Sequence, residues 1–112
     1  MDRYYSHNKF DLSGQTAVVT GGAGVLCAAM CKALAEGGAK VAVLDKNLPA
    51  AESLAEEIRT QAGEAIAVTC NVLDKNSLAV AAQAVITKFG RVDILINGAG
   101  GNNPQATTNG ER

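Results

Sequence analysis

The 112-residue sequence has no long apolar run, no basic cluster and no hydrophobic leader. Its apolar runs are too short to cross a bilayer, so we expect a soluble protein without a membrane partner. Ten basic and eleven acidic residues give a net charge of -1, and Lys and Arg nowhere cluster with aromatic residues, which argues against a nucleic-acid partner. The N-terminal segment, residues 1–15, contains acidic side chains and no apolar stretch, which predicts a cytoplasmic location.

Cysteine and histidine are also scarce. Cys27, Cys31 and Cys70 are odd in number and match no CxxC spacing, and the single histidine is His7. A disulfide framework or a metal site is therefore not expected. Cys27 and Cys31 are one helical turn apart, so we expect both to pack as small apolar side chains on one face of a helix.

The sequence does contain a regular alternation of two hydrophobic periods. It is 47% hydrophobic and 19% charged, and its length suffices for one core. Apolar runs typical of buried strands occupy residues 16–20, 40–45, 65–70 and 92–97, and helical periodicity fills the stretches between them. Strands that are apolar throughout and separated by helices predict βαβ units. We therefore expect an α/β fold, a Rossmann-like parallel sheet of strand order 3-2-1-4 with helices on both faces.

Local signals predict where the helices begin and end. The second helical stretch begins at a cap at or beside Asn47 and ends at Gly63, and the third begins at Asp74 and ends at Gly90. The apolar positions expected to face the core are Ala51, Leu54, Ala55 and Ile58 on the second helix, and Leu78, Ala81, Ala82, Val85 and Phe89 on the third.

A glycine-rich stretch, "TGGAGVLC", lies between the first strand and the first helix. Read as G-x-G-x-x-G, it has Gly22 and Gly24 at the first two positions and Cys27 at the third, where close packing of helix on strand needs a small side chain. Asp45 ends the second strand about 20 residues on, where an acidic residue binds ribose hydroxyls. This context favours dinucleotide binding, and the alternative is an empty glycine turn. The domain prediction is a lead segment over 1–15, a partial dinucleotide-binding domain over 16–100, and a polar loop or disordered tail over 101–112.

The segments "FDLSGQTAVVTGGAG", "CNVLD" and "VDILINGAG", with Asp45 after the first of them, resemble the N-terminal half of a short-chain dehydrogenase/reductase. The resemblance covers nearly the whole chain. Thr20 and Gly21 match the opening of the family's T-G-x-x-x-G-x-G motif, whereas Val25 and Cys27 stand at its later glycines in an ungapped register. The alternative is a loop one residue shorter, with Gly24 as the middle glycine. The family's N-N-A-G motif appears here as N-G-A-G, beginning at Asn97.

The resemblance implies a cofactor site built from the glycine loop and the strand ends. Asn71 stands where relatives usually carry an aspartate near the adenine ring, and residues 97–100 would line the nicotinamide side. The alternative is that Asn71 and Asn97 only cap loop backbone at strand ends. The expected cofactor-binding residues are Gly21, Gly22, Gly24, Val25, Leu26, Asp45, Asn71, Val72, Asn97, Gly98, Ala99 and Gly100.

The resemblance also implies a reaction, hydride transfer between nicotinamide and an alcohol or carbonyl compound. In relatives a Ser, a Tyr and a Lys beyond the fourth strand carry it. The one Tyr-x-x-x-Lys here, Tyr5 to Lys9, precedes the first strand, so we expect no catalytic residue in this chain. Two functions remain open: the NAD(P)-binding portion of an oxidoreductase, or a non-catalytic dinucleotide-binding module that acts by interaction. The nucleotide sequence downstream of Arg112 would distinguish them.

Three finer expectations concern cofactor, substrate and assembly. Asp45 favours NAD over NADP, because a carboxylate accepts hydrogen bonds from the ribose hydroxyls and repels a 2′-phosphate. The segment "GAGGNNPQATT", residues 98–108, is similar to D-mannonate and D-fructuronate oxidoreductases, which implies a sugar acid or another small polar alcohol or carbonyl substrate. Relatives are commonly dimers or tetramers, so the resemblance implies a homo-oligomer for the full-length protein.

Overall fold

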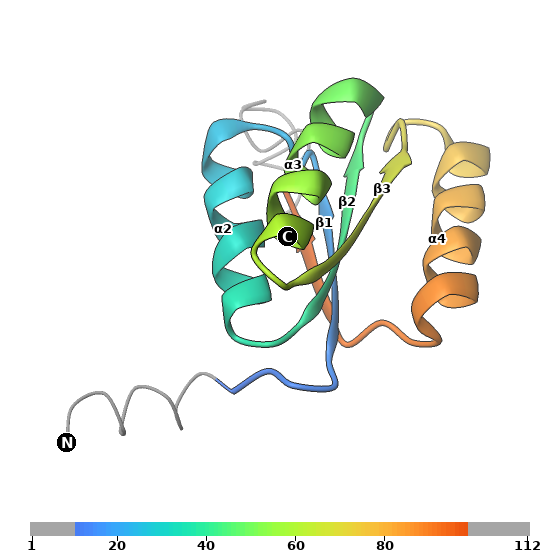
Figure 1. Ribbon diagram of the computed structural model, residues 1–112. Coiled ribbons are helices and arrows are strands. Elements are labelled where there is room, and N and C mark those ends of the chain that lie inside the picture. The colour runs from blue at the N-terminus through green and yellow to red at the C-terminus, as the bar shows by residue number, and fades with distance from the viewer. Residues whose placement is uncertain (1–10, 99–112) are drawn as a thin grey trace, which may run out of the picture.

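The computed structural model describes residues 11–98, in which strands and helices alternate (Figure 1). Tyr5, Lys9, Ala99, Gly100 and the predicted tail lie outside the described residues. In chain order the elements are β1 (Thr16–Thr20), α2 (Val25–Glu36), β2 (Lys40–Asp45), α3 (Leu48–Thr60), β3 (Glu64–Thr69), α4 (Lys75–Phe89) and β4 (Ile94–Asn97). None of these helices is long and apolar enough to cross a membrane.

The strands form one parallel sheet in the order β3-β2-β1-β4, which confirms the predicted order. Helices α2 and α3 cover one face of the sheet and α4 covers the other (Figure 1). Parallel strands joined by right-handed crossovers place consecutive helices in this way, since the chain reverses its direction of winding once, after β3. The α/β prediction is therefore confirmed.

Neighbouring residues of β1 belong to opposite faces of the core. Val19 packs with Val41 and Val43 under α2 and α3, whereas Val18 packs with Ala42 and Leu44 under α4. Side chains alternate between the two faces of a strand, so a strand buried on both faces is apolar along most of its length, as at residues 17–19 of β1. The uninterrupted apolar runs in the sequence have this cause.

Helix α3 matches its predicted face but ends early. The Asn47 side chain caps it by accepting a hydrogen bond from Ala50 N at 3.1 Å, and all four predicted core positions are buried. The helix stops at Thr60, three residues before Gly63. A Cβ at Gly63 would lie 2.7 Å from Ile58 Cγ2, so this glycine lets the chain pass close over the helix end toward β3.

Helix α4 has the predicted ends and a narrower buried face. Asp74 caps it through Asn76 N at 2.9 Å, and Gly90 ends it in the left-handed region at φ 86°. Only Ala81 and Val85 are fully buried, while Phe89 is partly buried. The prediction that Leu78 and Ala82 face the core is wrong, because both are exposed. The helix packs on β3 and β2.

Strand β4 begins two residues later than predicted and lies at an edge of the sheet. Asp93 comes just before it, where its carboxylate accepts a hydrogen bond from Thr16 N at 2.8 Å and its own N–H donates to Thr16 O at 2.9 Å. Leu95 is 67% exposed. Within the described residues, β4 therefore presents an uncovered apolar side chain next to an unpaired strand edge.

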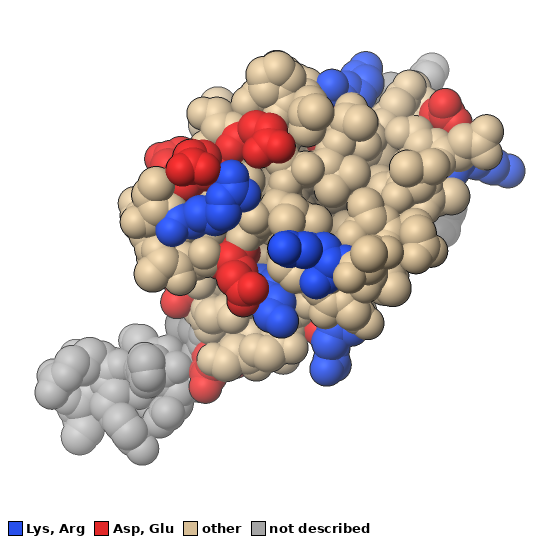
Figure 2. Space-filling model, turned by 45° about the vertical axis from the view of Figure 1, so that its right-hand side comes forward, with Lys and Arg blue, Asp and Glu red and all other residues tan. Residues whose placement is uncertain are grey.

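Acidic and basic side chains intermingle on the face of the molecule seen in Figure 2. Several are paired: Lys32 of α2 contacts Glu57 of α3 at 2.9 Å, and Arg59 contacts Glu56 of the same helix at 3.0 Å. These residues are about half exposed, so such pairs each contribute little, of the order of 0–1 kcal/mol.

Candidate functional site

The carboxyl ends of the four strands bring the predicted site residues to one edge of the sheet. The glycine loop follows β1, Asp45 ends β2, Asn71 follows β3 and Asn97 ends β4. The strand order reverses between β1 and β4, which is where open α/β sheets form a ligand crevice. The ends of β1 and β4 therefore meet at the topological switch point, while Asp45 lies one strand away from β1 and Asn71 two strands away.

The glycine loop is anchored on the end of β2. Gly21 N and Gly22 N both donate to Leu44 O, at 2.7 and 3.2 Å. Gly21 has φ 66°, and a Cβ at Gly22 would lie 2.9 Å from Val43 Cγ1 and 3.1 Å from Val19 O. Gly24 has φ -68° and room for a Cβ, 3.5 Å from Gly21 O. The tight turn therefore requires Gly21 and Gly22, whereas Gly24 has a conformation that other residues also adopt.

The N-terminus of α2 has no side-chain cap. Gly24 occupies the N-cap position, and no acidic residue lies in the first turn. By contrast, α3 and α4 are capped by Asn47 and Asp74. Val25 and Leu26, in the first turn, are 93% and 74% exposed. The first-turn N–H groups and the positive end of the helix dipole can therefore receive an anion.

Asp45 links the glycine loop to the start of α3. Its Oδ2 accepts a hydrogen bond from Ala23 N at 3.1 Å, and its Oδ1 accepts one from Asn47 N at 2.9 Å. A carboxylate has about four lone-pair sites, so this group can accept further hydrogen bonds. The bond to Asn47 follows from the local Asx spacing, but the bond to Ala23 was not predicted, because it depends on the pairing of β1 with β2.

Asn97 joins the ends of β1 and β4. Its Oδ1 accepts a hydrogen bond from Thr20 Oγ1 at 2.7 Å, and the next residue, Gly98, donates its N–H to Thr20 O at 2.9 Å. Thr20 and Asn97 are paired in the parallel register. The Asn97 oxygen therefore accepts its hydrogen bond from a side chain. The capping alternative would have this oxygen accept from loop backbone instead.

Asn71 is exposed and caps its own loop. Its Oδ1 accepts a hydrogen bond from Leu73 N at 3.0 Å, and its N–H donates to Ser77 Oγ at 2.8 Å. This hydrogen bond is of the kind that the loop-capping alternative describes. Val72 packs against the core cluster under α4.

Cys27 and Gly98 form a contact that sequence reasoning missed. A Cβ on Gly98 would overlap the Cys27 sulfur and lie 2.9 Å from Thr20 O. Cys27 stands where the family motif has glycine, and Gly98 stands where the second motif has asparagine. These two departures from the family motifs could have been interpreted together, because Cys27 is larger than the glycine of its motif and Gly98 is smaller than the asparagine of the other.

The cysteines behave as small apolar side chains, as predicted. Cys31 is buried in the core cluster under α2 and α3, and Cys27 is partly buried against the same cluster. Burial raises the pKa of the Cys31 thiol to about 12, with a smaller contribution from the neighbouring Cys27. Within residues 11–98, no group of His, Cys, Asp and Glu is arranged to hold a metal ion.

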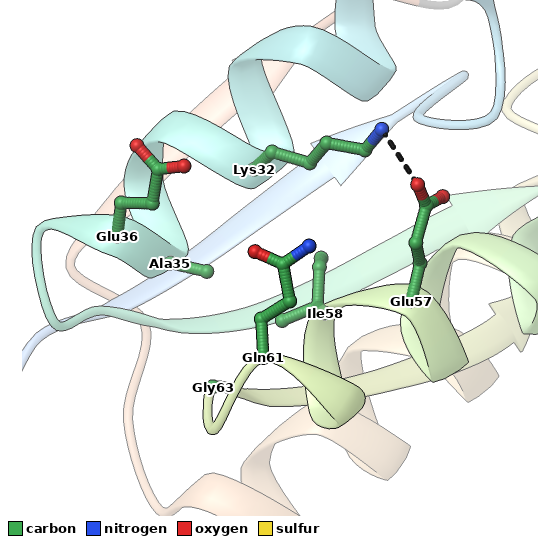
Figure 3. Close-up of a pocket in the computed structure, with 7 residues that line it drawn as sticks. All are labelled: Lys32, Ala35, Glu36, Glu57, Ile58, Gln61 and Gly63. Atoms are coloured by element: carbon green, nitrogen blue, oxygen red, sulfur yellow. Dashed lines mark ion pairs between the residues drawn. The ribbon is translucent and has the colours of Figure 1, made fainter.

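A surface pocket of about 140 Å³ lies between α2 and α3 (Figure 3). It is formed by the C-terminal turns of both helices and the loop before β3, so it opens at the amino ends of the strands, away from the predicted site. The Lys32–Glu57 ion pair crosses it. Its lining residues are Lys32, Ala35, Glu36, Glu57, Ile58, Gln61 and Gly63.

Comparisons with known proteins agree on one family. Residues 15–111 match the family model described as short chain dehydrogenase. The chain is 48% identical over 101 residues to the uncharacterized oxidoreductase UxuB of Bacillus subtilis, and 43% identical over 91 residues to D-threitol dehydrogenase of Mycolicibacterium smegmatis. These matches cover 90% and 81% of this chain, and 36% and 35% of the two relatives.

A solved structure shows the same fold. A crystal structure from Haemophilus influenza, described as a candidate D-mannonate oxidoreductase with bound NAD, superposes with a TM-score of 0.82 at 42% identity. The superposition covers 90% of this chain and 36% of that one. The fold is thus a Rossmann-like α/β sheet, and the chain belongs to the short-chain dehydrogenase family of oxidoreductases. It spans about a third of the length of these relatives.

Proposed function

We propose that this chain is the NAD-binding portion of an oxidoreductase that transfers hydride between nicotinamide and an alcohol or carbonyl substrate, with residues 16–100 as its partial dinucleotide-binding domain. The single observation that carries the proposal is the uncapped N-terminus of α2, next to the Gly21–Gly22 turn at the switch point. The other two described helices have side-chain caps, so this terminus alone lacks a protein group that would compete with a phosphate.

The residues at this edge fit a dinucleotide. The first-turn N–H groups of Val25, Leu26 and Cys27 would bind the pyrophosphate, and the tight turn at Gly22 would let it approach the backbone. Asn71 would lie toward the adenine and residues 97–100 toward the nicotinamide. When bound, the cofactor supplies the hydride or accepts it. This chain's residues bind and orient it, and the proton-transfer groups would come from the remainder of a longer protein.

Asp45 supports NAD rather than NADP. The hydrogen bonds from Ala23 N and Asn47 N hold the carboxylate between the glycine loop and α3, with acceptor capacity left for the ribose hydroxyls. A 2′-phosphate at that place would repel the carboxylate. Lys46, the next residue, opposes this preference, so the discrimination rests on how closely each side chain approaches the ribose.

Two relatives support a small polyhydroxylated substrate for the whole protein. One is described as a D-mannonate oxidoreductase candidate and another as D-threitol dehydrogenase. Both names indicate polar alcohols with several hydroxyl groups. We therefore propose a sugar acid such as D-mannonate, or a related polyol, as the substrate, and a homo-oligomer as the assembly of the full-length protein.

The test is a titration of the chain with NAD⁺ and NADP⁺. Binding is measured by saturation-transfer NMR, which detects weak complexes. We expect NAD⁺ to bind more tightly, and Asp45→Asn to reduce the difference, because the amide still accepts a hydrogen bond but carries no charge. The control is Glu36→Gln, which removes one negative charge at the end of α2, at the opposite edge of the sheet. Equal or tighter binding of NADP⁺ by the unsubstituted chain would contradict the NAD assignment.

A further inference from the structure

The first turn of α2 and the end of β4 are in contact at Cys27 and Gly98. Gly98 directly follows β4, and its missing side chain leaves space that the Cys27 sulfur occupies. Cys27 Cβ would lie 3.7 Å from a Cβ on Gly98, which is an ordinary contact distance, so the sulfur is the one Cys27 atom that overlaps it, and Thr20 O is a second close neighbour at 2.9 Å. The Gly98 backbone is fixed independently by its hydrogen bond to Thr20 O.

We propose that Cys27 is a positioning residue of the cofactor site, acting as one of a coupled pair with Gly98. The thiol fills the space above Gly98 and so sets how closely the first turn of α2 approaches the end of β4. This inference rests on the proposed function for its effect on cofactor binding, because that turn would bind the pyrophosphate. The packing itself does not depend on the proposed function.

The geometry predicts that the two positions change together. A methyl group at residue 98 meets the Cys27 sulfur first, and the side chain of residue 27 must then move outward or the helix must shift. Replacing Cys27 by Ala removes the sulfur and keeps a residue that favours helix. The methyl group would still lie 2.9 Å from Thr20 O, so relief in the double variant is partial.

The first test is a thermodynamic cycle by thermal unfolding. Gly98→Ala is expected to lower Tm strongly in the unsubstituted chain, and clearly less in the Cys27→Ala background. The matched control is Cys31→Ala, one helical turn further on, in whose background Gly98→Ala should cost as much as in the unsubstituted chain. Additive shifts in both backgrounds would overturn the pair. If Gly98→Ala does not fold alone, a folded Cys27→Ala/Gly98→Ala protein supports the pair, and a Cys31→Ala/Gly98→Ala protein that folds equally well overturns it.

The second test separates positioning from mere stability. Cys27→Leu would push the first turn of α2 away from β4 and is expected to weaken NAD⁺ binding about tenfold, as seen by saturation-transfer NMR at a temperature where the chain is folded. Cys31→Val lowers Tm through the core and should leave the NAD⁺ dissociation constant unchanged. Unchanged affinity in Cys27→Leu would overturn the positioning role. Coupled melts with no NAD⁺ binding by the unsubstituted chain would support the packing pair and contradict the proposed function.

Discussion

At the scale of single residues, the candidate site depends on groups that also hold the fold together. The Asp45 carboxylate fixes Ala23 N of the glycine loop and the start of α3 before any ligand is present. Gly22 is needed because Val43 and the Val19 carbonyl leave no room for a methyl group. A substitution at Asp45 or Gly22 would therefore change both the site and the stability of the fold. A matched control variant is needed to separate the two effects.

Cys31 gives a prediction about alkaline pH. Its pKa rises from 9.0 to about 12 in the folded chain, because burial disfavours the thiolate. The unfolded chain therefore loses this proton first, so the contribution of Cys31 is fully present below pH 9.0 and is lost as the pH rises toward 12. We expect the free energy of unfolding in urea to fall above pH 9.0 in the unsubstituted chain.

The comparison variant is Cys31→Ala. It should be less stable at neutral pH, because it leaves a cavity under α2 and α3, but its stability should fall less steeply above pH 9.0. Parallel pH profiles of the two proteins would show that the Cys31 thiol does not carry the alkaline loss.

At the scale of elements, the three described helices differ at their N-termini. At α3 and α4 the side chain of the N-cap residue accepts hydrogen bonds from N–H groups of the first turn, and at α2 a glycine stands at the same position. Gly24 has an extended conformation, φ -68° and ψ 159°, which suits any N-cap residue, and it has room for a Cβ. The chain could therefore carry a cap here without strain, and it does not.

Gly24→Asp tests the meaning of that missing cap. A carboxylate at the N-cap would bind the first-turn N–H groups and interact favourably with the helix dipole, so we expect the free energy of unfolding to rise by about 0.3–1 kcal/mol. The same carboxylate would occupy the proposed phosphate position, so NAD⁺ binding should weaken. Thermal unfolding and saturation-transfer NMR measure the two effects.

Gly24→Asn is the matched variant, because it caps the helix without the charge and should weaken NAD⁺ binding less. A Gly24→Asp chain that is more stable and binds NAD⁺ as well as the unsubstituted chain would contradict the placement of the phosphate at α2.

At the scale of the whole molecule, β4 is the element whose surroundings are incomplete among the described residues. It is an edge strand, and its Leu95 side chain is mostly exposed. The matches cover only 36% and 35% of two relatives, so those proteins contain further chain. Unpaired strand edges with apolar side chains associate with one another.

We therefore expect a polypeptide of these 112 residues, taken alone, to self-associate, to bind NAD⁺ weakly and to catalyse no hydride transfer. Light scattering over a range of concentrations measures the association. Leu95→Lys should reduce it, because a charge on an edge strand opposes pairing. Val80→Lys adds the same charge at an exposed position of α4, away from the β4 edge, and should reduce self-association less.

Catalysis is checked by nicotinamide absorbance with D-mannonate and a panel of polyols and sugar acids. Cofactor-dependent turnover by the purified 112-residue polypeptide would contradict the expectation and would bring Tyr5 and Lys9 back as candidates. Tight NAD⁺ binding without turnover would favour the non-catalytic module instead.

Much of the fold could be predicted because its signals are local or periodic. The caps at Asn47, Asp74 and Gly90 act on backbone within a few residues, and the buried face of α3 follows from helical spacing. The strand order follows from right-handed crossovers between apolar strands. The narrower face of α4 could not be predicted, because exposure of Leu78 and Ala82 depends on which strands the helix covers.

The sequence by itself thus determined the elements, their order in the sheet and the family, since each follows from periodicity, chain connectivity or motif spacing. Only the tertiary structure decided that the tight turn requires Gly21 and Gly22, that Asp45 binds Ala23 N, and that the Cys27 sulfur lies over Gly98. These contacts join segments distant in the chain, at distances of a few ångströms. They exist because β1 pairs with β2 on one side and β4 on the other, and the spacing of residues along the sequence carries no record of a fit that close.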